Sequence, residues 1–430
     1  MQTQSQPQLV RAIGRWTLAA LVINAIIGSG IYGLPTQVAQ LLGAAAPLAY
    51  LLAAAGMGVI MACFAEVASQ FREAGGPYLY AREAFGRFVG IEMGWLAFLV
   101  RLASAAANAN LFVISLGGFI PQVTQPVPRA TILVVLLGLL CFVNIRGVRS
   151  GAQLSNFFTV AKILPLLLFV GAGIGFTAGR FPVGLSEASA ADWYLATLAL
   201  VFALGGFESS LMPMGEAKDP RRDAPFALFT GLAVCATLYL LIHLVVMALV
   251  PAAQLGERPL ADAAGVMFGP AGASFIAAAA MLSTYGYLSG QMLSAPRMPY
   301  AMAEQGDFPP ALAAVHPRFQ TPHVSILAYT ALAVALAIYG SFFWNAILSA
   351  VARLFVYASV AGALLVFRRR MPQADAYRLP AGYLFAALSI AFCAVLVLRM
   401  ELQHLYVLLA VTALALINWL WARRAGTGTR

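Results

Sequence analysis

The stretch NAIIGSGIYGLP, residues 24–35, lies inside the first long apolar segment of the chain. Gly28 and Gly30 flank Ser29 at a point where a membrane helix would normally continue. Glycine costs about 1 kcal/mol in a helix interior, and each backbone group without a partner in lipid costs several more. The stretch therefore predicts a helix interrupted at this point, with its open backbone facing protein or a water-filled cavity.

The composition around this stretch is that of a helical membrane protein. The chain has 430 residues, of which 61% are hydrophobic and 10% charged, and its mean hydropathy is +0.84. A soluble domain cannot bury that much apolar surface. Because loop charges set the topology of a membrane protein, the net charge of +10 indicates orientation rather than a nucleic-acid partner.

The apolar segments predict an all-α polytopic membrane protein with twelve transmembrane helices. Placing the N-terminus in the cytosol puts most of the 26 basic residues on the cytosolic side. We therefore expect a protein of the cell membrane with both termini in the cytosol. The expected helices are 16–44, 46–70, 88–118, 130–147, 154–176, 193–217, 226–251, 270–300, 322–341, 344–367, 381–398 and 402–422.

A second stretch, VFALGGFESSLMPMGE at 201–216, interrupts a later apolar segment at Gly205 and Gly206. Broken helices at corresponding positions of two halves indicate an inverted-repeat transporter with a site at the membrane midplane. The alternative is two ordinary glycine kinks or close-packing sites, because glycine is common in membrane helices. The predicted organisation is a tail at 1–15, repeats of five helices at 16–176 and 193–368, two helices at 381–422, and a tail at 423–430.

Each interruption exposes backbone amides at one helix end and backbone carbonyls at the other. Amides at a helix N-terminus favour an anion, and free carbonyls favour a cation. A zwitterion satisfies both groups at once, so the breaks favour a zwitterionic ligand.

The remaining polar residues give no sign of an enzyme. The cysteines lie in apolar runs, the four histidines are scattered without ligand spacing, and no Gly-rich loop ending in GK[ST] is present. We therefore expect no catalytic residues, no metal, no cofactor and no obligatory protein partner, with transport driven by gradients. The cysteines are Cys63, Cys141, Cys235 and Cys393.

Four motifs make the chain resemble the amino acid–polyamine–organocation (APC) family of secondary transporters. They occur in the family's order and span nearly the full chain. The motifs are IIGSGIYGLP (26–35), FAEVASQFREAGGPYLYAREAFGRFVGIEMGW (64–95), FALGGFESSLMPMGEAKDPRRDAP (202–225) and PRMPYAMAEQGDFPPALAAVHPRFQTPHVS (296–325).

The resemblance implies a LeuT-type 5+5 inverted repeat with broken helices 1 and 6, two additional C-terminal helices, and alternating access. It also implies where a substrate amino acid would bind. Its carboxylate would meet backbone amides around Ser29, Gly30 and Ile31, and its ammonium would meet carbonyls near Ile26, Phe202 and Gly205. Gly28 and Gly206, at the same two breaks, are further candidate substrate-binding residues. Phe202 resembles an aromatic gate that closes over the substrate.

Charged residues inside membrane helices are expensive and are functional by default. The resemblance places the Lys162 ammonium where sodium-coupled relatives hold sodium. Desolvation favours the neutral form of a lysine, so Lys162 is also a candidate proton carrier. The alternative is a fixed structural charge. Glu208, after the second break, is expected either to couple ion movement or to hold the unwound segment.

Arg101 lies close to positions that line the side-chain pocket in relatives. An arginine there would repel cationic side chains and attract acidic ones. The alternative is a structural charge, for example one paired with Glu208. Another carboxylate, Glu66, lies near the cytosolic end of the second expected helix and is interpreted as a loop anchor rather than a proton relay.

The predicted function is a sodium-independent, secondary active amino acid transporter, with protons as a candidate coupled ion. The alternatives are an amino acid exchanger or a polyamine antiporter on the same fold, or an amino acid sensor that does not transport. The substrate, the coupling mode and the oligomeric state stay open at this point.

Overall fold

The computed structural model describes residues 13–71, 75–147, 151–185, 187–371 and 376–425. Most of the two predicted tails, at 1–12 and 426–430, lies outside the described residues.

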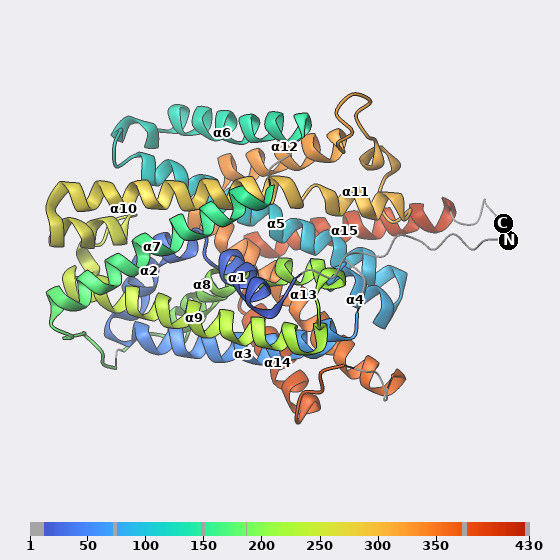
Figure 1. Cartoon of the computed structure of the whole chain (residues 1–430), viewed down its shortest axis with the longest axis horizontal. Coiled ribbons are helices and arrows are strands. Elements are labelled where there is room, and N and C mark those ends of the chain that lie inside the picture. Colours follow the sequence, from blue (N-terminus) through green and yellow to red (C-terminus); the bar gives the residue numbers. More distant parts are fainter. Residues whose placement is uncertain (1–12, 72–74, 148–150, 186, 372–375, 426–430) are drawn as a thin grey trace.

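The described chain is helical, and it contains no β-strand apart from one isolated bridge between Ile13 and Ala217. Long helices run side by side along the long axis of the molecule (Figure 1). The α-helices are α1 (Arg15–Ile26), α2 (Gly30–Leu42), α3 (Ala46–Ser69), α4 (Gly76–Phe85), α5 (Arg87–Leu116), α6 (Pro126–Arg146), α7 (Gly151–Thr177), α8 (Ala190–Leu204), α9 (Pro220–Leu249), α10 (Pro259–Ser294), α11 (Arg297–Glu304), α12 (His323–Tyr339), α13 (Phe342–Arg370), α14 (Gly382–Val397) and α15 (Leu402–Ala425).

Many of these helices can span a membrane. Among the described residues, eight helical stretches are long and apolar enough to cross a bilayer, and four shorter apolar helices accompany them. The four are Arg15–Ile26, Ala161–Thr177, His323–Tyr339 and Gly382–Val397. Each apolar segment expected from the sequence overlaps a described helix. The prediction of a multi-pass helical membrane protein is confirmed at this level.

Two details differ from the expected segments. α10 consists of two helical pieces, because Gly269 has a non-helical backbone (φ 65°, ψ −158°) and is followed by Pro270. The second piece begins near residue 270, as expected, and the piece before Gly269 was not expected. After the second break the chain continues as a 3₁₀ helix, η3 (Phe207–Glu216), rather than as an α-helix.

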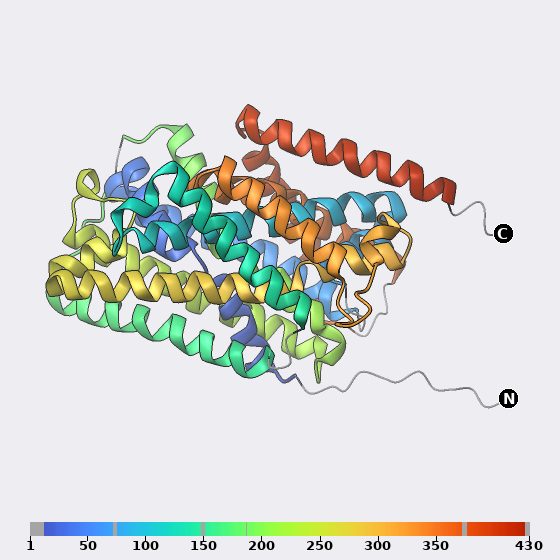
Figure 2. The ribbon, with the colours of Figure 1, turned by 90° about the horizontal axis from the view of Figure 1, so that it is seen from above.

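The interrupted helices lie in the centre of the bundle. α4, α11 and the C-terminal end of α15 lie at one end of the molecule, on the right in Figure 1, which we call the terminal end; the opposite end is the far end. α15 runs along the periphery and contacts α5 and α13 (Figure 2). α1 packs against α9, and α8 packs against α3.

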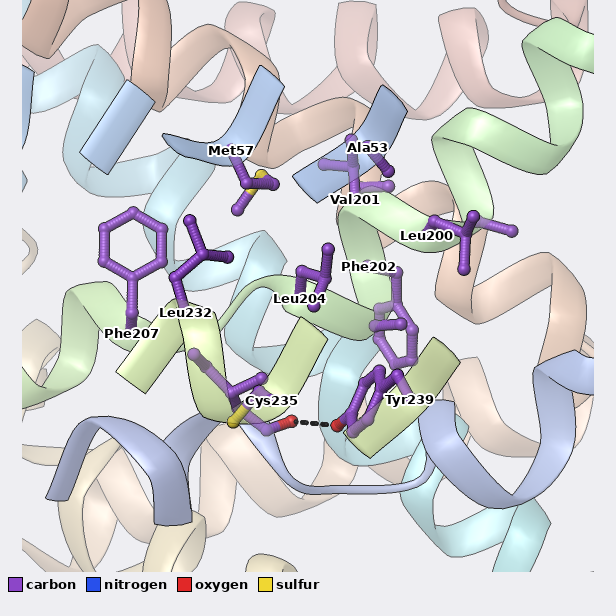
Figure 3. Close-up of a cluster of buried hydrophobic side chains, with 14 of the residues drawn as sticks. Ala53, Met57, Leu200, Val201, Phe202, Leu204, Phe207, Leu232, Cys235 and Tyr239 are labelled. Carbon is purple, nitrogen blue, oxygen red and sulfur yellow. Dashed lines mark hydrogen bonds between the residues drawn. The ribbon is translucent and has the colours of Figure 1, made fainter. Parts of the chain in front are cut away.

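Buried apolar side chains fill the space between the central helices. Ala53 and Met57 of α3 meet Val201 and Leu204 of α8, and Cys235 of α9 lies in the same cluster (Figure 3). All five side chains are buried. Within a membrane, such close packing stabilises helix pairs through van der Waals contacts rather than through the hydrophobic effect.

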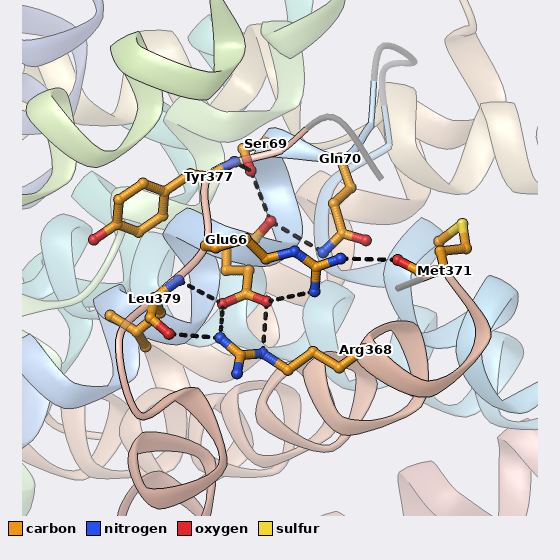
Figure 4. A network of polar contacts seen from close by, with 8 residues as sticks. Glu66, Ser69, Gln70, Arg368, Met371, Tyr377 and Leu379 are labelled. Atoms are coloured by element: carbon orange, nitrogen blue, oxygen red, sulfur yellow. Dashed lines mark hydrogen bonds and ion pairs between the residues drawn. The ribbon is translucent and has the colours of Figure 1, made fainter. Parts of the chain in front are cut away.

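Glu66 fixes the connection between α13 and α14 at the terminal end (Figure 4). Its carboxylate is fully buried and accepts two hydrogen bonds from Arg368, at 2.8 and 2.6 Å. The backbone N–H of Leu379 donates a third, at 2.8 Å. These contacts are those of a loop anchor, as the sequence predicted.

Candidate functional site

The first break separates α1 from α2. α1 ends at Ile26 and α2 begins at Gly30. The N–H of Ser29 donates to Asn108 Oδ1 of α5 at 3.1 Å. Within the described chain, the N–H groups of Gly30 and Ile31 make no hydrogen bond. Two of the predicted carboxylate-binding amides are therefore free, and the third is held by Asn108.

Lys162 of α7 reaches the C-terminal end of α1. Its side chain is 2% exposed, and its ammonium donates to Asn24 Oδ1 at 3.2 Å and to the carbonyl oxygen of Ile27 at 3.3 Å. Carbonyls at the end of a helix carry partial negative charge, so this is a favourable position for a cation. No carboxylate of the described chain forms an ion pair with Lys162.

The carbonyl of Ile26 has a partner that was not predicted. The hydroxyl of Tyr239, on α9, donates to it at 3.0 Å (Figure 3). A carbonyl oxygen has two lone pairs, so Ile26 can accept a further donor.

The second break lies between α8 and η3. Gly206 has a φ of 102°, and a Cβ atom there would lie 2.5 Å from the carbonyl oxygen of Ala25 in α1. Both the conformation and the contact require glycine. The N–H of Gly205 donates to the carbonyl of Phe202 at 3.2 Å, so one predicted ammonium acceptor already has one partner.

Glu208 holds this second break in place. Its Oε2 accepts the N–H of Gly206 at 3.0 Å and the hydroxyl of Tyr357 at 2.9 Å, and Arg353 Nε donates to Oε1 at 3.0 Å. Arg353 and Tyr357 both come from α13. Glu208 therefore pairs with Arg353, and the suggested pairing of Glu208 with Arg101 is not found.

The two breaks lie side by side because Gly30 packs directly on α8. A Cβ atom at Gly30 would lie 2.8 Å from the Cα atom of Ala203. Real Cβ atoms do not approach backbone this closely, so α2 and α8 would have to separate to admit a side chain.

We expect Gly30→Ala to lower the free energy of unfolding by about 1–3 kcal/mol, the usual cost of overpacking. The matched control is Gly28→Ala, because a Cβ atom there makes ordinary contacts of 3.5 Å or more, with Tyr287 and Asn108. Thermal unfolding of the purified variants in one detergent measures both. Equal stability of the two variants would contradict the close approach of α2 to α8.

Phe202, the predicted gate, packs towards the far end. Its side chain is 7% exposed, and its ring lies 6.5 Å from that of Phe342, edge to face. Phe342 is the first residue of α13 and lines a separate cavity that also contains Arg129 and Glu257.

Two cavities open beside the breaks on the terminal side. The first is lined by Ala25, Arg101, Gly206, Glu208 and Arg353, among others. The second is lined by Asn24, Arg101, Lys162, Ser209 and Ser210, among others, and shares Tyr287 and Gln291 with the first. Of the predicted site residues, these cavities bring together Arg101, Lys162, Gly206 and Glu208.

The other predicted residues line neither cavity. The ring of Tyr287 covers Gly28, since a Cβ atom at Gly28 would lie 3.5 Å from it. Tyr287 thus stands between the first break and the cavities. The residues outside the cavity walls are Ile26, Gly28, Ser29, Gly30, Ile31, Phe202 and Gly205.

A polar cluster borders the first cavity at the terminal end. Tyr78 lines the cavity and donates to Asp307 Oδ2 at 2.5 Å, and Arg82 and Arg87 pair with the same carboxylate at 2.9 and 2.6 Å. Burial, with the Asp307 hydrogen bond as the second cause, raises the pKa of Tyr78. The phenol therefore stays protonated and keeps donating. These contacts tie α4 and α5 to the segment after α11.

Sequence reasoning missed Asn108, Tyr239, Tyr287 and Tyr357. Each is a polar residue on a helix that is otherwise apolar. Three of them contact the first break, and Tyr357 contacts the Glu208 carboxylate at the second break. The signal available was their polarity within a membrane helix.

No group of three metal-ligating side chains occurs in the part of the chain that the structure describes. The four cysteines are buried and free, and they lie away from the cavities. The chain is thus a polytopic helical membrane protein with a buried polar site at two adjacent helix breaks.

Comparison with known proteins identifies the family. Residues 13–420 match the amino acid permease family, so the chain belongs to it, and the resemblance to APC transporters is confirmed. A serine/threonine exchanger of Bacillus subtilis is 29% identical over 76% of this chain and 76% of its own length. A methylthioribose transporter of the same bacterium is 25% identical over 96% of this chain and 91% of its own length. An arginine/agmatine antiporter of Chlamydia pneumoniae is 24% identical over 96% of this chain and 90% of its own length.

Proposed function

We propose that this chain is a sodium-independent, secondary active amino acid transporter that works by alternating access. The observation that carries the proposal is the position of Lys162, whose buried ammonium contacts the Ile27 carbonyl at the break between α1 and α2. A positive charge at that point takes the place of a bound cation, so no sodium ion is needed there.

The proposed architecture is twelve membrane helices, of which the first ten form a 5+5 inverted repeat. The first repeat, 16–176, contains α1 with α2, α3, α5, α6 and α7. The second, 193–368, contains α8 with η3, α9, α10, α12 and α13. The helices at 381–422, α14 and α15, follow.

The packing of the helices supports this repeat. Taken in chain order, α5 of the first repeat corresponds to α10 of the second, and α7 corresponds to α13. Exchanging each helix for its counterpart turns the contact between α5 and α13 into a contact between α10 and α7, and both contacts exist. In the same way α1–α9 becomes α8–α3, and α5–α12 becomes α10–α6. Ten unrelated helices would have no reason to pack in exchangeable pairs.

The amino acid is proposed to bind between the breaks. Its carboxylate would accept from the free amides of Gly30 and Ile31, with Ser29 joining them if Asn108 withdraws. Its ammonium would donate to carbonyls near Ile26, Phe202 and Gly205, beside Gly206. Tyr287 would move off Gly28 to admit it from the terminal side, and Phe202 would close the far side.

Protons are the proposed coupled ion, and Lys162 is the proposed carrier. Glu208 already receives three donors, among them the Arg353 guanidinium, so we propose that it holds the unwound segment. We place the protein in the cell membrane with both termini in the cytosol. No cofactor, metal or catalytic residue is part of the proposal.

Two alternatives on the same fold follow from the relatives. One relative is a serine/threonine exchanger, and exchange would use the same site. Another is an arginine/agmatine antiporter, but here the carboxylate of Glu208 is already paired with Arg353, which disfavours a cationic side chain. An amino acid sensor would bind without transport.

Counterflow into proteoliposomes tests the proposal. Vesicles holding the full chain are preloaded with a mixed amino acid pool, and uptake of labelled amino acids is followed in sodium-free buffer, with and without an inward proton gradient. We expect uptake above that of empty vesicles, and stimulation by the gradient. Binding without any uptake would favour the sensor, and stimulation only by internal polyamine would favour the antiporter.

A further inference from the structure

The larger of the two terminal-side cavities carries uncompensated positive charge. It has a volume of about 340 Å³, a size suited to a small organic ligand. Arg101 and Lys162 are the charged residues in its wall, and no carboxylate of the described chain joins them there.

Arg101 has no counter-charge of its own. Arg101 is buried, at 7% exposure, and its guanidinium contacts only neutral groups, Gln291 Oε1 at 3.3 Å and Met212 Sδ at 3.2 Å. The nearby carboxylate of Glu208 is already paired with Arg353. A guanidinium has five N–H donors, so most of those of Arg101 are uncommitted.

A second group in the same wall also lacks a partner. Ser210 is 5% exposed, and its hydroxyl makes no hydrogen bond within the described chain. Gln291 turns its carbonyl oxygen towards Arg101 and donates from Nε2 to Tyr287 at 3.0 Å. The cavity wall therefore has unused donors, on Arg101 and Ser210, for an anionic ligand.

Burying an unpaired charge costs several kcal/mol, and a charge inside a membrane protein is costly to keep without a function. A ligand that brings a carboxylate removes this cost when it binds. Arginine is suited to that ligand because its planar fork matches the two oxygens of a carboxylate.

We propose that Arg101 determines substrate specificity, and that the substrate is an amino acid with a second carboxylate in its side chain. This inference rests on the proposed function. With the amino acid backbone at the two breaks, the side chain extends past Ala25 and Gly206, which border the first cavity, towards Arg101. The side-chain carboxylate pairs with the guanidinium and accepts from Ser210.

An isosteric pair of amino acids tests the inference on the unmodified protein. L-glutamate and L-glutamine have the same shape and differ in charge, and the same holds for L-aspartate and L-asparagine. Concentration-dependent counterflow is measured for all four in wild-type proteoliposomes. Because a hydrogen-bonded ionic contact contributes about 1.5–3 kcal/mol, the acidic member is expected to be preferred by about 10- to 100-fold.

Variants then assign the preference to one side chain. Arg101→Gln is expected to remove the preference, and Arg101→Lys to keep part of it, because lysine keeps the charge but loses the fork. The control is Arg318→Gln, an exposed arginine outside both cavities, which is expected to keep the wild-type preference.

The outcomes separate this inference from the proposed function. Uptake of neutral amino acids with no preference for acidic ones would overturn the inference and leave the transporter intact. An acidic preference that survives in folded Arg101→Gln would also overturn it. Absence of uptake for every amino acid would overturn both. The wild-type comparison stands even if Arg101→Gln does not fold.

Discussion

Replacing Lys162 with alanine is expected to reduce amino acid uptake to the level of empty vesicles. The ammonium makes two hydrogen bonds at the first break, to Asn24 and to the carbonyl of Ile27. Hydrogen bonds from a charged donor contribute about 1.5–3 kcal/mol each. Losing both is therefore expected to lower the equilibrium constant for forming this arrangement of the first break by more than about 100-fold. Initial uptake rates in sodium-free proteoliposomes measure the effect.

Two further variants show whether charge or packing is responsible. Lys162→Met keeps most of the side-chain volume but removes the charge, and it is expected to behave like Lys162→Ala. Lys162→Arg keeps the charge and is expected to retain more uptake than either, but without stimulation by the proton gradient, because an arginine does not release its proton. Each variant must elute as folded protein on gel filtration. Wild-type rates in folded Lys162→Met would contradict the role of the ammonium.

Replacing Glu208 with glutamine is expected to destabilise the protein by about 3–5 kcal/mol, because it leaves Arg353 as an unpaired buried charge. The side chain of Arg353 is 4% exposed, and its Nη1 has no hydrogen-bond partner among the described residues. The variant also weakens the contact that fixes Gly206. The midpoint of thermal unfolding in detergent measures the loss.

The double variant Glu208→Gln/Arg353→Met tests the cause of this loss. Removing both charges is expected to recover part of the stability, since no buried charge is then left unpaired. Glu401→Gln is the control, because the Glu401 side chain is 59% exposed and a surface change costs within about 0.5 kcal/mol. A double variant less stable than Glu208→Gln would contradict the charge account.

Much of the fold follows from periodicity and composition. The apolar segments and both interruptions were predictable, because lipid penalises an unpaired backbone whatever its neighbours are. Lys162 was predictable as a functional candidate for the same reason, as a charge inside a membrane helix. Its partners, Asn24 and Ile27, depend on how α7 packs on α1. One sequence does not determine that packing.

The contacts of the site were less predictable than its location. Glu208 and Arg353 are 145 residues apart, and nothing local to either residue indicates the other. Tyr239 and Tyr287 lie in helices where an aromatic residue is equally consistent with core packing. The form of η3 was also missed, because the residues after Gly206 do not by themselves distinguish a 3₁₀ helix from an α-helix.

Sodium dependence of wild-type uptake tests the central claim most directly. Labelled amino acid uptake is measured in proteoliposomes while external sodium is exchanged for choline at constant ionic strength. If the Lys162 ammonium occupies the place of a bound cation, the initial rate is the same at every sodium concentration, including zero. A rate that falls to background without sodium would contradict the claim, because the site would then require the ion that Lys162 is proposed to replace.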